Sequence, residues 1–401
     1  MKALKSQQLH IGFFGKTNSG KSSLINKITG QEVSIVSDIA GTTTDIVEKS
    51  MELLPIGSVR FLDTAGINDF SILGKDRKEK TLKTINRTDI AVIVCDYNGI
   101  DDYEKSLIAQ FNDLNIPYLV IVNKTDEKNI SADKMTELEQ ISTDIIQTSA
   151  KEDDDLVYKF KNKIVELLPD DYVNPPKIAG DLAEEKSTVI LVIPIDKEAP
   201  KGRIILPQVQ VLRDLLDSNC NVMAVKDTEL KNALDNLKTP PSLVITDSQA
   251  FKTVAEIVPE NIPLTSFSIL FARLKGDLKA FISGAKAIDT LQDGDKVLIL
   301  ESCTHHAIED DIGKVKIPNL LRKKTGKNLI FEYFSGHDFP EISQYKLIVH
   351  CGACMTNRRE ILSRIIKANK IGIPITNYGI TISYCLGILE RATKMFQLYQ
   401  G

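Results

Sequence analysis

The sequence predicts an α/β protein made of three modules, and two observations carry this prediction. Short apolar runs alternate with amphipathic stretches along nearly all of the 401 residues, which is typical of parallel sheets with helices on both faces. The chain is also much longer than one ordinary domain of roughly 150 residues. We therefore expect separate α/β units, each with its own sheet.

The apolar runs and amphipathic stretches place the individual elements. Buried strands are expected at Ile11–Phe14, Val59–Leu62, Ile90–Cys95, Tyr118–Val122, Ile145–Thr148, Thr188–Ile193, Asn221–Val225, Leu243–Ile245, Lys296–Leu300, Asn328–Glu332 and Lys346–His350. Amphipathic helices between the later strands are expected at Val209–Leu216, Glu229–Leu237 and Arg358–Ala368.

Module boundaries are expected at two places. The segment Pro169–Pro176 is polar and proline-bearing, as linkers are. The second boundary falls between Val258 and Leu278, where one α/β unit ends and another begins. We assign the first, middle and last modules to residues 1–170, 177–262 and 263–401.

Composition and charge exclude several classes of protein. Apolar residues make up 42% of the chain and charged residues 26%, and 50 basic against 54 acidic side chains leave a net charge of −4. A global electrostatic attraction to nucleic acid or anionic lipid is therefore not expected. No run reaches the roughly 18–20 apolar residues of a membrane span, and no hydrophobic signal core follows Met1. Six Cys are too few for a disulfide-stapled secreted fold, so we expect a cytoplasmic protein without a membrane or nucleic-acid partner.

A phosphate-binding loop is predicted near the start of the chain. Residues 15–22 (GKTNSGKS) fit the pattern G-x-x-x-x-G-K-S/T between a strand and an apolar-periodic helix. The loop amides and the helix N-terminus are expected to bind phosphate, Lys21 to add a charge toward the β- and γ-phosphates, and Ser22 to offer its hydroxyl to Mg²⁺. The residues expected around the phosphates are Gly15, Asn18, Ser19, Gly20, Lys21, Ser22 and Ser23.

Three further segments follow predicted strands in the order of a guanine-nucleotide site. Residues 63–66 (DTAG) place Asp63 to hold Mg²⁺ through water and the Gly66 amide near the γ-phosphate. In residues 123–126 (NKTD), the Asp126 carboxylate accepts from N1–H and the exocyclic amine of guanine, whereas adenine would present an acceptor to it. The amides of residues 149–151 are expected at guanine O6. The residues expected around the base are Asn123, Lys124, Asp126, Ser149 and Ala150.

On these motifs, residues 1 to about 170 resemble a translation-factor-type small GTPase domain, most closely that of the bacterial tRNA-modification GTPases. Residues 37–45 (SDIAGTTTD) are similar to their switch I, and the resemblance implies that Thr43 reaches Mg²⁺ in the triphosphate state. It also implies a K⁺ site at the Asn18 side chain and the carbonyls of Ser37 and Ile39. A cation there would add positive charge between the β- and γ-phosphates, where transition-state charge accumulates.

One residue departs from the Ras-type pattern. Ile67 follows the DTAG segment, and its apolar side chain cannot orient the attacking water as a Gln does. The resemblance implies a Glu further into switch II, for which Asp69, Asp76 and Glu79 are the candidates. We expect slow, K⁺-stimulated, switch-like GTP hydrolysis. The residues expected to act in catalysis are Lys21, Thr43, Asp63 and Gly66.

The last module contains a cysteine and histidine pattern, C-x-H followed later by H-C-x-x-C. Its members are Cys303, His305, His350, Cys351 and Cys354. Both clusters directly follow predicted strands, and the carboxyl ends of parallel strands are where α/β folds place ligands. Three thiols and two imidazoles are therefore expected to converge at one edge of a sheet.

Four interpretations of this pattern stay open on the residues alone. Three thiolates suit a [4Fe–4S] core and leave one iron open. Three thiolates with one imidazole also suit tetrahedral Zn²⁺, and spacing leaves zinc and iron nearly level. A disulfide between Cys351 and Cys354 is disfavoured in the cytoplasm, and the fourth interpretation is burial of unrelated cysteines.

Together, the two motif sets resemble the [FeFe]-hydrogenase maturation GTPases over essentially the full chain. That resemblance implies a [4Fe–4S] cluster on Cys303, Cys351 and Cys354, with His305 and His350 at an exchangeable fourth position or beside the ligands; a carboxylate such as Glu301 or Glu309 is the alternative there.

The same resemblance implies a scaffold or carrier, with a dimerisation domain in the middle module and a homodimer. Such a protein accepts a transient diiron subcluster precursor, made with two radical-SAM maturases, and delivers it to apo-[FeFe]-hydrogenase. Two rivals remain: a GTPase of tRNA modification or ribosome assembly with a structural zinc, and an interaction switch with redox-active thiols. Iron and zinc analysis with visible absorption of anaerobically purified protein separates the three.

Overall fold

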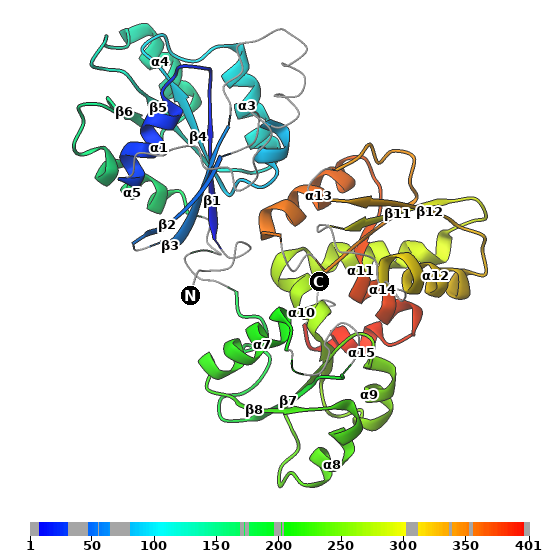
Figure 1. Cartoon of the computed structure of the whole chain (residues 1–401). Helices are drawn as coiled ribbons and strands as arrows, with labels where there is room; N and C mark the ends of the chain where they lie inside the picture. The colour runs from blue at the N-terminus through cyan, green and yellow to red at the C-terminus, as the bar shows by residue number, and fades with distance from the viewer. Residues whose placement is uncertain are drawn as a thin grey trace. The chain divides into compact units, whose positions relative to one another are not determined.

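A computed structural model describes residues 8–30, 47–54, 56–64, 81–168, 172, 176–195, 202, 204–301, 312–336, 339–352 and 356–396. The chain divides into two compact units, Met1–Pro175 and Pro176–Gly401, drawn from blue to red in Figure 1. The division lies within the proline-bearing segment that the sequence singles out as a linker.

Within its described residues, the first unit contains a six-stranded sheet in the order β2-β3-β1-β4-β5-β6. The strands are β1 (Leu9–Phe14), β2 (Val47–Leu53), β3 (Gly57–Asp63), β4 (Ile90–Cys95), β5 (Tyr118–Val122) and β6 (Ile145–Gln147). The helices are α1 (Lys21–Thr29), α3 (Asp102–Asp113), α4 (Ala132–Ile141) and α5 (Leu156–Glu166). The edge strand β2 runs antiparallel to β3, and the other neighbouring pairs are parallel.

Helices cover both faces of this sheet, which explains its continuous apolar runs. Side chains alternate between faces along a strand, and neighbouring residues of β1 show it. The Phe13 ring lies 6.0 Å from that of Phe160 on α5, centroid to centroid, whereas the Phe14 ring lies 5.1 Å from that of Phe111 on α3. β1 is therefore buried along its whole length, and the loop that follows it begins after Phe14.

In the described part of the second unit there are two four-stranded sheets, in the orders β10-β9-β7-β8 and β12-β11-β13-β14. Their strands, all parallel to their neighbours, are β7 (Thr188–Val192), β8 (Asn221–Val225), β9 (Leu243–Thr246), β10 (Leu264–Ser266), β11 (Lys296–Glu301), β12 (Ile330–Ser335), β13 (Leu347–His350) and β14 (Ile375–Asn377). The helices are α7 (Leu206–Asp217), α8 (Leu230–Asp235), α9 (Phe251–Ile257), α10 (Phe267–Lys275), α11 (Leu278–Lys286), α12 (Ile317–Thr325), α13 (Arg358–Lys370), α14 (Tyr378–Cys385) and α15 (Leu389–Thr393). Short helical turns lie at η2 (Asp227–Glu229), η3 (Ala287–Thr290), η4 (Ile312–Lys316) and η5 (Lys394–Phe396).

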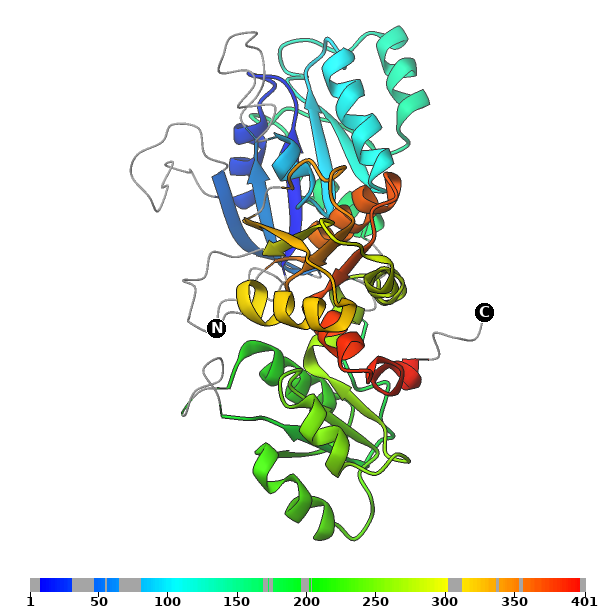
Figure 2. The same ribbon diagram turned by 90° about the vertical axis from the view of Figure 1, so that its right-hand side faces the viewer.

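The two sheets of the second unit share one hydrophobic core. A single cluster of buried apolar residues includes Val192 and Val244 of one sheet and Val297 and Ile348 of the other. Helix α10 contacts α7 beside the first of these sheets and α13 and α14 beside the second, and Figures 1 and 2 show it between them. The two sheets are therefore packed as one body.

The predicted α/β class and three modules are confirmed. Three strands were not predicted: β2, whose sequence VEKSMEL carries charges, and the three-residue strands β10 and β14. Because β10 pairs with β9, the middle sheet extends past residue 262, the last residue that the sequence assigns to the middle module. Every helix in the described ranges is too short or too polar to span a lipid bilayer.

Candidate functional site

The phosphate-binding loop lies between β1 and α1, and its backbone shape depends on glycine. Gly15 and Gly20 have φ angles of 138° and 91°. A Cβ atom would lie 2.2 Å from the Val94 carbonyl oxygen at Gly15 and 2.1 Å from Asn123 Nδ2 at Gly20, so no larger residue fits. Asn18 is also left-handed, with φ 65°, a conformation that Asn tolerates.

The side chain of Lys21 lies under this loop. Its Nζ donates to the carbonyl oxygens of Gly15 at 2.9 Å and Lys16 at 2.6 Å. The side chain is buried, and burial lowers the pKa of Lys21 to about 8. The structure thus holds an ammonium group at the loop, where a phosphate would meet it.

Ser22 and Asp63 form a pair of oxygen groups suited to Mg²⁺. Phe13 on β1 is in register with Asp63 on β3, which brings the end of β3 beside the start of α1. The Ser22 hydroxyl donates to Asp63 Oδ2 at 2.7 Å, and burial raises the pKa of Asp63. Hard cations such as Mg²⁺ take this kind of ligand, so the donor set fits the ion. Ser23 lies on the exposed side of α1.

Asn123 joins two loops of the predicted nucleotide site. Its Nδ2 donates to the Ser19 carbonyl at 3.0 Å, and its Oδ1 accepts from the Ala150 amide at 3.0 Å. Residues far apart in the sequence are therefore tied together at one place. Sequence reasoning put Asn123 among the base-contacting residues, and its described contacts are to these loops.

Asp126 lies at the same end of the sheet, beyond β5. Its Oδ2 is 3.7 Å from Lys151 Nζ, and the Ser149 hydroxyl lowers the pKa of Asp126. At neutral pH this carboxylate is therefore ionised and can accept two hydrogen bonds from a base. Lys124, which lies between Asn123 and Asp126 in the sequence, has a left-handed backbone with φ 65°.

Glu104 is a site residue that sequence reasoning missed. This buried carboxylate, near the start of α3, accepts from the Lys16 amide at 3.2 Å with Oε1 and from the Asp101 amide at 3.2 Å with Oε2. Asp101 accepts in turn from the Tyr103 amide, which completes a capping box. The D-x-x-E spacing was the available signal, and the box anchors the phosphate loop to α3.

Several residues that the sequence assigns to the two sites lie outside the described residues. In the first unit these are Ser37, Ile39, Thr43, Gly66, Ile67, Asp69, Asp76 and Glu79. In the second unit they are Cys303, His305, Glu309 and Cys354.

Two described members of the cysteine pattern, His350 and Cys351, lie at the carboxyl end of the third sheet. β11 and β13 are neighbours, with Leu300 in register with His350, and the Cys351 amide donates to the Leu300 carbonyl at 2.8 Å. The chain therefore leaves β11 and β13 at the same edge of the sheet. Glu301, at the end of β11, accepts from the Tyr378 hydroxyl at 3.1 Å and from the Ser335 hydroxyl at 3.4 Å.

Both ring nitrogens of His350 are engaged by protein groups. Nε2 accepts from Arg364 Nη1 at 2.6 Å, and Nδ1 donates to the Cys351 carbonyl at 2.7 Å. Burial and the Arg364 charge lower the pKa of His350 to about 3, so the ring is neutral. Among the described residues alone, no three His, Cys, Asp or Glu side chains are grouped closely enough to hold a metal. The half-buried Cys351 thiol fits a thiolate-bound cluster in its chemistry and in its place at a strand end.

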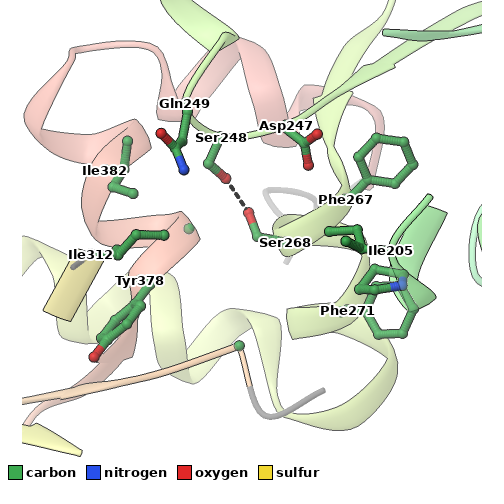
Figure 3. Close-up of a pocket in the computed structure, with 13 residues that line it drawn as sticks. Ile205, Asp247, Ser248, Gln249, Phe267, Ser268, Phe271, Ile312, Tyr378 and Ile382 are labelled. Atoms are coloured by element: carbon green, nitrogen blue, oxygen red, sulfur yellow. Dashed lines mark hydrogen bonds between the residues drawn. The ribbon is translucent and has the colours of Figure 1, made fainter. Parts of the chain in front are cut away.

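A pocket of about 170 Å³ lies beside Gly352, and Figure 3 shows its walls. Its lining comes from the segments that follow β7, β9 and β10 in one sheet and β11, β13 and β14 in the other, so the carboxyl ends of both sheets meet there. Phe267, Phe271, Ile312 and Ile382 form apolar walls. The hydroxyls of Ser248 and Ser268 are hydrogen-bonded to each other across it. The remaining lining residues are Ile205, Pro207, Asp247, Gln249, Tyr378 and Gly379.

Comparison with known proteins supports the nucleotide site. Residues 10–124 match the model of the 50S ribosome-binding GTPase family. The chain is 37% identical over 127 residues to the GTPase Der of Clostridium botulinum (strain Okra / Type B1), covering 30% of this chain and 29% of Der. It is 40% identical over 123 residues to the tRNA modification GTPase MnmE of Prochlorococcus marinus (strain NATL1A), covering 30% of this chain and 26% of that protein. The chain thus spans less than a third of the length of these curated relatives.

Among solved structures, Era of Aquifex aeolicus is similar, with 21% identity, a TM-score of 0.35 and coverage of 54% of this chain and 94% of that chain. The GTPase-family match and the GTPase relatives identify the first module as a GTPase domain that binds GTP with Mg²⁺.

The rest of the chain matches two further family models. Residues 178–276 match the hydrogen maturase F dimerization domain, and residues 279–395 match the hydrogen maturase F tetramerization domain. The predicted dimerisation module is confirmed, and a second oligomerization domain, which the sequence did not predict, follows it. Together these two models cover more than half of the chain. With a GTPase domain followed by both of these domains, the chain belongs to hydrogen maturase F, the family of hydrogenase-maturation GTPases.

Proposed function

We propose that this protein is a GTPase and an iron–sulfur scaffold that carries a diiron subcluster precursor to apo-[FeFe]-hydrogenase. The observation that carries the proposal is the position of Cys351. It lies at the carboxyl edge of the third sheet, beside the end of β11. Parallel sheets bind ligands at that edge. The same chain holds a nucleotide site in its first unit, so a switch and a carrier are joined in one polypeptide.

In this proposal, Cys303, Cys351 and Cys354 supply three thiolates to a [4Fe–4S] cluster. When bound by three thiolates, such a cluster has one iron that is open to an exchangeable ligand. His305, Glu301 and Glu309 are the candidates for that ligand or for groups beside it. The resident cysteines stay reduced in the cytoplasm, which is where we place the protein.

The pocket beside Gly352 is the proposed place for the cargo. It lies next to the cysteine segment, and its apolar walls and hydroxyl groups suit a compact ligand that accepts a few hydrogen bonds. Two radical-SAM maturases supply the precursor in this scheme, and a homodimer or larger oligomer presents it. GTP binding and hydrolysis bias docking or release through the conformations of the switch segments.

We propose slow GTP hydrolysis that K⁺ stimulates. Lys21 holds the β- and γ-phosphates, Ser22, Asp63 and Thr43 hold Mg²⁺ directly or through water, and Asn18 contributes to a K⁺ site. The left-handed backbone at Asn18 supports this role because it turns the loop at that residue. The Gly66 amide receives the γ-phosphate, and Asp126 selects guanine.

Metal analysis tests the scaffold. Anaerobically purified full-length protein is expected to be brown and to contain iron with visible charge-transfer absorption. Stoichiometric zinc in a colourless protein would instead support an RNA-directed GTPase with a structural zinc site, and intact thiols without metal would support a redox switch. Adding a diiron complex to the iron-bearing protein and then apo-hydrogenase tests delivery through the activation of hydrogenase.

Cation exchange tests the GTPase proposal. Hydrolysis is expected to be faster in K⁺ than in Na⁺ at equal ionic strength, and Asn18→Ala is expected to remove the difference. The matched control is Thr29→Ala, because Thr29 is the last residue of α1, at the end away from the phosphate loop. Equal rates in the two cations would show that this part of the proposal is wrong.

A further inference from the structure

Two buried basic side chains are linked by hydrogen bonds to the two ends of the segment 351–356. This segment contains the proposed ligands Cys351 and Cys354. Arg364 reaches the first end through His350, and Lys275 reaches the second end directly. They come from different helices, α13 and α10. Neither Arg364 nor Lys275 belongs to the cysteine and histidine pattern.

At the first end, Arg364 holds the ring of His350. Its guanidinium donates from Nη1 to His350 Nε2 at 2.6 Å, and from Nη2 to the Gly336 carbonyl at 2.9 Å and to Glu360 Oε1 at 2.7 Å. Arg364 is 2% exposed, and His350 and Glu360 are each 1% exposed. Because an arginine is always protonated and only donates, His350 must carry its proton on Nδ1. That proton is directed at the Cys351 carbonyl, 2.7 Å away.

At the second end, Lys275 holds the backbone of Thr356. This lysine is the last residue of α10 and is 7% exposed. Its Nζ donates to the Thr356 carbonyl at 3.1 Å and lies 5.9 Å from the centroid of the Phe271 ring. α10 directly follows β10, a strand of the other sheet, so a residue of the dimerization domain contacts the cysteine segment.

We propose that Arg364, acting through His350, and Lys275 are positioning residues that hold the carbonyl groups at both ends of the cysteine segment, and that His350 is not an iron ligand. The inference rests on the proposed cluster site. A buried carbonyl that loses its donor is destabilising, so each contact favours the observed backbone position at that end of the segment. Hydrogen bonds around metal ligands fix ligand orientation in this way, and their loss typically weakens metal binding roughly 10- to 100-fold.

The first experiment replaces the lysine. Lys275→Met keeps the length of the side chain and removes its donor, and Lys275→Arg keeps the charge and a donor. In the full-length, iron-loaded protein, we expect the Met variant to lose iron to a chelator roughly 10- to 100-fold faster than the native protein and the Arg variant to recover most of the difference. Lys286→Met is the matched control, because Lys286 is the exposed last residue of α11. Equal rates for Lys275→Met and the control would overturn the role of Lys275.

The second experiment concerns His350 and Arg364. Removing Arg364 alone would take an ion-pair partner from the buried Glu360 carboxylate and destabilise the fold, so the variant is the pair Arg364→Met with Glu360→Met. We expect His350→Gln and this pair to accelerate iron loss, and their combination to add little, since both remove the same contact. Pulsed electron paramagnetic resonance of the reduced native protein is expected to show no coupling to a coordinated imidazole. A histidine nitrogen coupling that disappears in His350→Gln would overturn the proposal.

A third measurement needs no iron and separates this inference from the proposed function. Hydrogen exchange of the peptide 347–358 in metal-free protein is expected to be faster in Lys275→Met and His350→Gln than in the native chain, because the ends of the segment open more easily. Native protein that never binds iron would contradict the scaffold and leave this exchange result standing. Unchanged exchange in both variants would contradict the positioning role, whatever the iron content.

Discussion

The second and third sheets are built in the same way and differ in the residues at their carboxyl ends. Number the four strands of each sheet in the order in which they occur along the chain. In both sheets the first strand pairs with the second and the third, and the fourth pairs with the third. The orders β8-β7-β9-β10 and β12-β11-β13-β14 therefore correspond. The fourth strand is three residues long in both. It runs directly into a helix whose N-cap is the last residue of the strand, Ser266 for α10 and Asn377 for α14.

The chemistry differs at the end of the third strand. β9 ends at Thr246 and is followed by Asp247, whose Oδ2 accepts from Gln208 Nε2 at 2.9 Å. β13 ends at His350 and is followed by Cys351. A carboxylate held by a neighbouring helix therefore takes the place that a thiol takes in the other sheet. The comparison shows that one backbone arrangement presents different groups at the same edge, and that function follows from those groups.

The largest expected effect tests whether only the third sheet binds iron. Cys351→Ser is expected to lower the bound iron at least about tenfold, which is the lower bound for losing a group beside a metal ligand. Asp247→Asn, at the corresponding position of the second sheet, is the control and is expected to keep the iron of the [4Fe–4S] cluster, although Asp247 also lines the pocket beside Gly352. Iron analysis of both anaerobically purified variants checks this, and equal losses would break the comparison.

The contact between the two repeated helices gives the next effect. A Cβ at Gly379, the second residue of α14, would lie 2.1 Å from Oγ and 2.5 Å from Cβ of Ser268, the second residue of α10. Gly379→Ala is therefore expected to destabilise the second unit by about 1–3 kcal/mol, as overpacking does. Urea unfolding measures the loss. Adding Ser268→Gly is expected to restore part of it, and a double variant no more stable than Gly379→Ala would contradict this contact.

The first sheet extends the comparison, because the loop that follows its strand β1 contains the buried ammonium group of Lys21. Burial lowers the pKa of Lys21 to about 8, and a bound phosphate would favour the charged form and raise that pKa again. The free protein therefore loses the Lys21 proton as the pH rises through 8, and GTP affinity is expected to fall about tenfold between pH 7 and pH 9. Titration with a fluorescent GTP analogue checks this. Lys21→Arg, which stays charged, is expected to lack the slope even if it binds more weakly.

The smallest effect concerns the two equivalent helix caps. The Ser266 hydroxyl accepts from the Ile269 amide at 3.3 Å, and Asn377 Oδ1 accepts from the Ile380 amide at 2.9 Å. Ser266→Ala and Asn377→Ala are each expected to cost about 1 kcal/mol of unfolding free energy. Chemical denaturation compares them, with Ser283→Ala at an exposed position of α11 as the reference. Costs that differ several-fold would show that the two caps are not equivalent.

Local patterns in the sequence predicted much of the fold. β4 and β5 lie where continuous apolar runs place them. Burial on both faces leaves such a run, which can be recognised from the local sequence alone. β2 was missed because an edge strand with one exposed face carries charges such as Glu48 and Lys49. β10 and β14 were missed because three residues are too few to show a period.

The order of motifs in the amino-acid chain by itself determined a guanine-nucleotide domain and a cysteine pattern at strand ends, because loops that bind phosphate and base are short and contiguous. Only the tertiary structure decided that Asn123 joins two loops, that Glu104 anchors one of them, the phosphate loop, to α3, and that Arg364 donates to Nε2 of His350. These contacts join a side chain to a backbone or side-chain group 14 to 104 positions away in the chain. Their partners are chosen by packing in three dimensions, which no local spacing records.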